Sequence, residues 1–181
     1  MPQIILASAS AGRKKVLESL GIKFKVIPAE IDERKITASS PFLLVKKLAR
    51  LKAEKVFSLA RRPLTRLKVS KSIIIAADSL AIIEEKRIKD QKMRKKLAKH
   101  RLGNYYVLGK PTTKSETITF LTTLSNNIHY FLTGLYIINT KDKAIYQSVT
   151  KTKLWFNKLT EEQIKDYVKS QPVLTYAGAI K

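Results

Sequence analysis

Four charged side chains that lie far apart in the sequence could act together on a phosphoanhydride. They are Glu33, Lys52, Asp78 and Lys110. The two carboxylates could hold Mg²⁺, which prefers oxygen ligands and keeps several waters, while the two lysines and Arg13 could neutralise phosphate oxygens. Hydrolysis needs such a set because charge builds on the bridging and leaving oxygens as water attacks phosphorus. Asp78 could be the base for that water.

Two of these residues lie on or beside elements that the sequence predicts with clear patterns. Pro41 begins a helix that extends to about residue 60, with apolar residues at helical spacing and Lys52 among them. The apolar run 72–77 predicts an interior strand that ends at Asp78 and Ser79. Carboxylates at the carboxyl ends of such strands are common places for chemistry in α/β folds. Taken singly, each charged residue is also consistent with an ordinary surface charge.

The amino-terminal segment predicts a strand, a serine turn and a basic helix start. The strand covers 4–7, and Ser10 is the expected N-cap of a helix with Val16, Leu17 and Leu20 on its apolar face. A helix N-terminus favours anions, and Arg13 adds positive charge there. A phosphate site is one interpretation; an ordinary strand–turn–helix unit with solvated cations is the other.

Composition indicates one globular domain and suggests which classes of molecule it could bind. The chain has 181 residues, of which 44% are hydrophobic, and it has no cysteine. No apolar stretch is long enough to span a bilayer and no signal-peptide pattern is present, so we expect a cytoplasmic protein without a membrane partner. The net charge of +22 indicates a polyanionic partner, a generally basic proteome, or both.

A dense run of nine Lys and Arg lies between Glu84 and Arg101, a segment expected to be an exposed basic helix or a disordered excursion. Tyr105 and Tyr106 follow it as candidate residues for stacking on bases. His100 and His129 are too isolated in the sequence to suggest a metal cluster, and neither a Walker A loop nor a GxGxxG element is present.

Short motifs spread over nearly the whole chain resemble, in their order, the Maf (septum formation inhibitor) family of nucleoside triphosphate pyrophosphatases. No single tripeptide is specific, so the resemblance depends on the ordered set. Its members are Leu6-Ala7-Ser8-Ala9-Ser10 with Arg13, Ile31-Asp32-Glu33, Leu48-Ala49 with Lys52-Ala53, Ala76-Ala77-Asp78-Ser79, Gly109-Lys110-Pro111, Leu124-Ser125, Thr133-Gly134 and Tyr176-Ala177-Gly178-Ala179.

The resemblance implies an α/β fold, similar to inosine triphosphate pyrophosphatase, in which a long curved mixed sheet is flanked by helices and a cleft lies between two lobes. It implies hydrolysis of a nucleoside triphosphate, a pyrimidine or modified nucleotide, to the monophosphate and pyrophosphate with Mg²⁺ or Mn²⁺. Such a reaction would serve nucleotide-pool sanitation. A homodimer is possible, and the sequence does not determine the oligomeric state.

The resemblance also implies roles for individual residues. Asp78 matches the proton acceptor, and Asp78 and Glu33 match metal-contacting residues. The matched substrate-binding residues are Ser8, Arg13, Lys52 and Lys110, and the positions tied to substrate choice are Gly12 and Ser79.

Three departures from the family pattern affect these expectations. Gly12 lacks the side chain that helps to distinguish subfamilies, so the nucleotide is not fixed. A basic insertion covers about 84–104, and the closing carboxyl-terminal segment of the family is expected to be missing from the single domain 1–181. The alternative function is therefore a catalytically impaired member that uses its basic surface to bind nucleic acid or acts as a division-related interaction protein.

Overall fold

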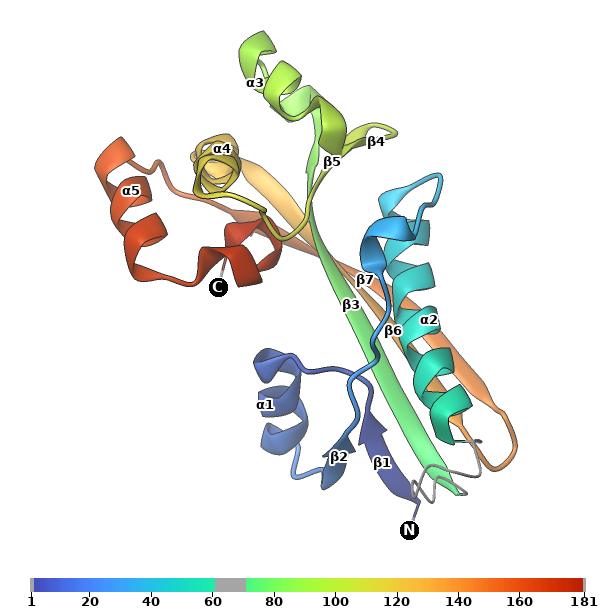
Figure 1. Cartoon of the computed structure of the whole chain (residues 1–181). Helices are drawn as coiled ribbons and strands as arrows, with labels where there is room; N and C mark the ends of the chain where they lie inside the picture. The colour runs from blue at the N-terminus through green and yellow to red at the C-terminus, as the bar shows by residue number, and fades with distance from the viewer. Residues whose placement is uncertain (1, 61–70, 181) are drawn as a thin grey trace. The chain divides into compact units, whose positions relative to one another are not determined.

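The computed structural model describes residues 2–60 and 71–180, which form an α/β fold with a seven-stranded mixed sheet flanked by helices (Figure 1). The chain divides into two compact units. Unit 1 comprises Met1–Ala38, Phe42–Asp78 and Gly134–Val149; unit 2 comprises Ser39–Pro41, Ser79–Thr133 and Thr150–Lys181. Among the described residues, no helix is long and apolar enough to cross a membrane.

The apolar amino-terminal run forms a strand, as predicted, and the structure shows that it pairs in parallel on both sides. Strand β1 (Gln3–Leu6) lies between β2 (Phe24–Val26) and the first part of β3 (Ser72–Glu84), so that Ile4 is opposite both Phe24 and Ile73. Ile5 and Ile74 are fully buried, because a parallel strand is covered on both faces.

Helix α1 (Ala11–Ser19) follows β1 through the serine turn. Its N-cap is Ser10, as predicted, and the Ser10 Oγ accepts a hydrogen bond from the Arg13 N–H. Its predicted apolar face does not enter the core, since Val16 is 59% and Leu20 is 66% exposed while Leu17 is half-buried. Helix α1 therefore contains no buried residue and lacks a core-facing apolar stripe.

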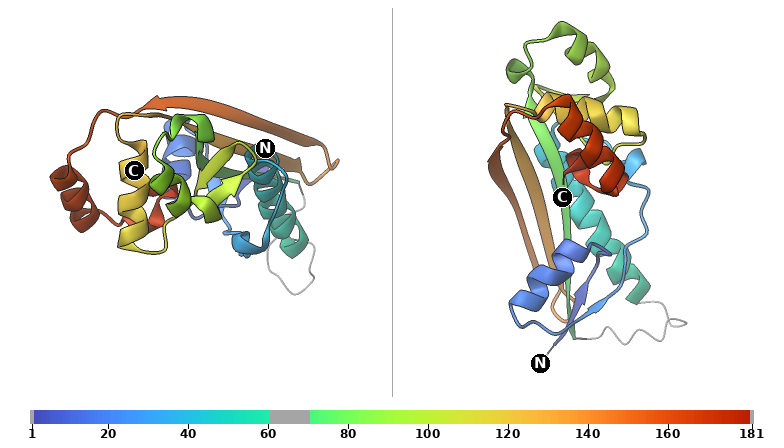
Figure 2. Two further views of the ribbon diagram at one scale, coloured as in Figure 1. Left: turned by 90° about the horizontal axis from the view of Figure 1, so that it is seen from above. Right: turned by 90° about the vertical axis from the view of Figure 1, so that its left-hand side faces the viewer.

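Helix α2 (Pro41–Ala60) has the bounds that its pattern predicts. Val45, Ala49, Ala53 and Val56 repeat at helical spacing and are all buried. The last three share a hydrophobic cluster with residues of β3 and of β6 (Ile128–Asn139), so α2 runs alongside these two strands (Figure 1, Figure 2).

Strand β3 is longer than predicted, which changes the surroundings of the candidate base. The sequence suggested an end at Asp78 and Ser79, but the strand continues to Glu84. The apolar residues 80–83 extend it, and β5 (Tyr105–Leu108) supplies an antiparallel partner on which Ala81 lies opposite Leu108. Asp78 is therefore inside a strand, where regular backbone pairing fixes the direction of its side chain.

Unit 2 is built around the second part of β3. Two antiparallel partners, β5 and β4 (Arg101–Leu102), pair beside it, and β6 pairs with β3 and with β7 (Ile145–Trp155). Helix α4 (Lys114–Leu124) contributes Phe120 and Leu124 to the core. Helix α5 (Glu161–Ser170) starts with a capping box formed by Thr160 and Gln163.

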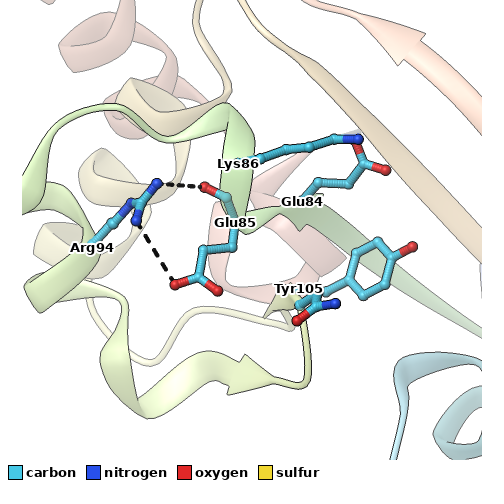
Figure 3. Close-up of a pocket in the computed structure, with 6 residues that line it drawn as sticks. Glu84, Glu85, Lys86, Arg94 and Tyr105 are labelled. Atoms are coloured by element: carbon cyan, nitrogen blue, oxygen red, sulfur yellow. Dashed lines mark hydrogen bonds and ion pairs between the residues drawn. The ribbon is translucent and has the colours of Figure 1, made fainter.

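The basic segment after β3 is ordered, so the predicted exposed basic helix is confirmed over part of its length and the predicted disordered excursion was wrong. It consists of a 3-10 turn (Glu85–Arg87), the short helix α3 (Gln91–Lys96) and a second 3-10 turn (Ala98–His100). Buried Ile88 and Leu97 anchor it to the core. The Arg94 guanidinium donates hydrogen bonds to the carbonyl oxygen of Ile88 at 2.6 Å and to that of Glu85 at 3.2 Å, and Figure 3 shows the second of these contacts. The lysines of the segment remain exposed around this anchored centre.

One ionisable side chain is buried in unit 2 without a polar contact. His129 on β6 has no hydrogen-bond partner at either ring nitrogen among the described residues. Its ring packs edge-on against Phe131 and Phe156, with centroids 6.4 and 5.3 Å away. Burial lowers the pKa of His129 to about 4, because the charged form loses its hydration.

We predict that His129 makes stability depend on pH. Its pKa is lower in the folded chain than the ordinary value of 6.5, so the unfolded state binds more protons between these values. The free energy of unfolding should fall by about 3 kcal/mol from this group as pH drops from 6.5 to 4. Urea titrations at several pH values in this range measure the free energy of unfolding, which should fall less steeply with falling pH in His129→Phe than in the parent protein. The same pH dependence in both proteins would contradict the prediction.

Candidate active site

One buried ammonium group joins the two candidate carboxylates. The Lys52 Nζ lies 2.8 Å from the Glu33 Oε1 and forms an ion pair and hydrogen bond with the Asp78 Oδ1. The side chains of Lys52 and Asp78 are 9% and 7% exposed, whereas that of Glu33 is 46% exposed. The site therefore has a dry inner pair and one outer carboxylate in contact with solvent.

Three different elements of unit 1 supply these groups. Lys52 lies on the core-facing side of α2, between the buried alanines 49 and 53. Asp78 is on β3, and Glu33 begins a 3-10 turn after β2 (Glu33–Lys35). A buried charge is tolerated when it is paired and hydrogen-bonded, so Lys52 on an apolar helix face requires partners such as these.

The serine turn places an arginine near the same carboxylates. The Ser8 Oγ accepts hydrogen bonds from the Arg13 Nη1 at 2.9 Å and from the Ser10 N–H at 3.2 Å. Burial lowers the pKa of the Arg13 guanidinium, and the charges of Asp78 and Glu33 oppose that shift. The guanidinium is thus oriented by Ser8 and within electrostatic range of both acids.

The surroundings of Asp78 make its carboxylate more basic than an exposed one. Burial raises its pKa most strongly, and the neighbouring charge of Glu33 raises it further. Lys52 and Arg13 act in the opposite direction, by charge and, for Lys52, by a hydrogen bond. A raised pKa suits a group that must take a proton, provided that the group stays ionised at the working pH.

Five of the predicted site residues come together in unit 1, and two lie in unit 2. Lys110 is exposed in the turn after β5, and the Ser79 Oγ lies 3.3 Å from the Thr133 Oγ1. The roles of both stay predictions. Gly12 lies in the first turn of α1, where a Cβ would meet only the Ser10 Oγ at 3.9 Å among the described residues, so there is room for a side chain.

Gly134 is a residue of the site's framework whose role the sequence did not reveal. A Cβ on this β6 residue would lie 2.6 Å from the carbonyl oxygen of Val45 and 2.9 Å from its carbonyl carbon. The absence of a side chain thus lets the backbone of α2, the helix that carries Lys52, approach the strand. A glycine inside a predicted strand is the sequence signal for such a close approach.

The family model described as Maf-like protein matches residues 3–181. This chain belongs to the Maf family. A dTTP/UTP pyrophosphatase of Treponema denticola is 30% identical over 181 residues, which cover 100% of this chain and 81% of the relative. A dTTP/UTP pyrophosphatase of Geobacillus sp. is 32% identical over 179 residues, 99% of this chain and 80% of the relative. A nucleoside triphosphate pyrophosphatase of Synechococcus sp. is 30% identical over 178 residues, 98% and 76% of the two chains.

Two carboxylates of this Maf site, those of Glu33 and Asp78, are the candidate ligands for a metal ion. Among residues 2–60 and 71–180, no group of three or more His, Cys, Asp or Glu side chains comes together as a metal site. Glu33 and Asp78 nonetheless contact the same Lys52 ammonium, so their carboxylates are close enough to share one cation. Two carboxylates completed by substrate oxygens and water are a common arrangement for Mg²⁺.

We predict that Gly134→Ala destabilises this Maf protein by about 1–3 kcal/mol, because the new methyl group would overlap the backbone of α2. Urea unfolding measures the change. Gly109→Ala is the matched control, since nothing lies within 4 Å of a Cβ built there. An unchanged free energy of unfolding for Gly134→Ala would show that α2 does not depend on this close approach.

We also predict strong coupling between Lys52 and Asp78. Lys52→Met should lower the free energy of unfolding by about 3–5 kcal/mol, because Asp78 would keep a buried charge without its partner. Adding Asp78→Asn to Lys52→Met should restore part of that loss, so that the two changes are less than additive.

The control is Lys55→Met on the exposed side of the same helix, which should change stability by less than about 0.5 kcal/mol. Additive effects of the two substitutions in the double-mutant cycle would contradict the coupling.

Proposed function

We propose that this Maf protein hydrolyses a nucleoside triphosphate, in particular a pyrimidine nucleotide, to the monophosphate and pyrophosphate. The observation that carries the proposal is the buried Lys52–Asp78 pair, which Glu33 and Arg13 flank within unit 1. Relatives at 30–32% identity that are named dTTP/UTP pyrophosphatase support the reaction and the substrate class. The reaction would remove unwanted nucleotides from the cellular pool.

In this proposal the serine turn binds the triphosphate. The Ser8 hydroxyl orients the Arg13 guanidinium, which can donate two parallel hydrogen bonds to phosphate oxygens. The N-terminus of α1 begins beside them and adds backbone N–H groups and a partial positive charge. Lys110 is proposed as a further phosphate contact.

Asp78 is proposed as the general base. Its carboxylate would take a proton from a water whose oxygen attacks the α-phosphorus, and the bond from that phosphorus to the bridging oxygen would break to release pyrophosphate. The ammonium of Lys52 holds the Asp78 carboxylate in place, and the site's burial strengthens its basicity. Negative charge on the leaving oxygens would be balanced by the fixed cations.

Glu33 and Asp78 would hold a divalent cation, Mg²⁺ or Mn²⁺, together with phosphate oxygens of the substrate. Such an ion would supply charge stabilisation at the reacting phosphate. Glu33 is suited to this because its side chain is half-exposed and accessible to an incoming ion. We further propose that Gly12 and Ser79 influence which base is accepted.

We predict that Asp78→Asn reduces kcat for pyrophosphate release by at least about 100-fold, because the amide cannot take the proton. The measurement is pyrophosphate release from a panel of nucleoside triphosphates with Mg²⁺ or Mn²⁺. Asp166→Asn on the exposed face of α5 is the control and should retain full turnover. Turnover unaffected by Asp78→Asn would remove Asp78 from the mechanism, and no turnover of any nucleotide by the parent chain would overturn the function.

A further inference from the structure

An exposed face of unit 2 combines aromatic rings with lysines. Trp155 on β7 is 66% exposed, and the Lys153 Nζ lies 4.3 Å from its ring centroid. The Lys151 Nζ lies 3.8 Å from the ring centroid of Tyr130 on β6 and 5.9 Å from that of Tyr105 on β5. Three aromatic residues on three strands are therefore each within reach of an ammonium group.

Strand geometry explains why these residues share one face. Side chains at alternate positions of a strand point to the same side, so Lys151, Lys153 and Trp155 form one row on β7. Lys151 is exposed and reaches over the ring of Tyr130, and the Tyr130 hydroxyl lies 3.5 Å from the Arg87 Nη2. Large rings are usually buried, so a tryptophan with most of its surface in solvent is informative.

The charge around this face is strongly positive. The adjoining segment from Glu84 to Arg101 has nine Lys and Arg against three Asp and Glu. The carboxylate of Glu84 is neutralised by Arg87 at 2.9 Å and Lys86 at 3.7 Å. Tyr105 also lines a hollow of about 540 Å³, in which Lys86 and Arg94 are balanced by Glu84 and Glu85 (Figure 3).

We propose that this face, formed by Tyr105, Tyr130, Lys151, Lys153 and Trp155, binds single-stranded nucleic acid. Unpaired bases can stack on the rings while their phosphates contact the lysines, and such stacking tolerates any base sequence. Sheets that present two or three aromatic residues bind RNA in this way. A duplex is disfavoured because its bases are already stacked on one another. Of the two stacking residues that the sequence suggested, Tyr105 belongs to this face and Tyr106 is buried, while Tyr130 on β6 and Trp155 on β7 supply the other rings.

Trp155 is the one tryptophan of the chain, so its fluorescence reports directly on this face. Adding a 20-nucleotide oligo(dT) to the full chain at low salt should quench the tryptophan emission, and a 20-base-pair duplex should quench it much less. Anisotropy of a fluorescein-labelled oligo(dT) gives the dissociation constant. Trp155→Ala should weaken binding at least about fivefold, as expected for the loss of one stacked base.

Two double variants that remove the same charge distinguish binding at this face from a general attraction of the oligonucleotide to a basic protein. Lys151→Ala/Lys153→Ala should weaken binding and reduce the slope of log K against log salt by about 1.4, because two phosphate contacts are lost. Lys165→Ala/Lys169→Ala removes the same charge from exposed positions of α5 and should leave most of the affinity. Thermal unfolding and pyrophosphate release verify that each variant is folded.

Three results would overturn the proposal. The first is equal weakening by the two lysine pairs, which would show that net charge alone attracts the oligonucleotide. The second is an unchanged dissociation constant for Trp155→Ala. The third is quenching of Trp155 by vesicles of anionic phospholipid but not by oligo(dT), which would assign the face to a membrane surface.

Discussion

The buried ammonium of Lys52 is the interaction on which the candidate site depends. It contacts carboxylates from two other parts of unit 1, Asp78 on β3 and Glu33 after β2. These contacts fix the rotation of α2 about its axis, because a turned helix would bury the lysine without a partner. The absence of a side chain at Gly134 also allows the backbone of α2 to lie close to β6. The close packing at Gly134 and the ion pairs of Lys52 are therefore both consistent with the same position of α2.

The same burial that constrains the helix also determines the chemistry available to Asp78. Removing water from the carboxylate raises its pKa, and Lys52 and Arg13 limit that rise by their charge. Two cations thus face two carboxylates in a largely dry site. Electrostatic interactions are stronger there than in water, so a group oriented in advance needs little reorganisation when charge develops in the reaction. The half-exposed carboxylate of Glu33 is accessible to a ligand from solvent.

The sequence predicted those features that depend on local patterns. The bounds of α2 and the Ser10 cap follow from residues close in the chain. The end of β3 could not be predicted from nearby residues, because its extension to Glu84 needs the partner strand β5, which follows more than twenty residues later. The exposure of Val16 and Leu20 was equally hidden, since apolar periodicity shows that a helix has a face but not what covers it.

For the site residues too, the sequence predicted their identity but not the contacts between them. Their order along the chain was enough to nominate Ser8, Arg13, Glu33, Lys52 and Asp78, and unit 1 brings all five together. The sequence could not show that one lysine would serve both acids, because that geometry arises from the packing of α2 against β3. Gly134 was visible as a strand glycine, but its function depends on the backbone of a helix that lies about ninety residues earlier.

The two charged regions of the chain follow opposite physical rules. In unit 1 the cations are paired with acids in a dry site, where salt screens their interactions little. On the face of β7 the lysines are exposed and lie over rings, so their attraction for an anion acts through solvent and weakens with salt. A small triphosphate suits the first arrangement because it can be enclosed by a few fixed groups. A flexible polyanion suits the second because it can exchange many weak contacts along an open strand.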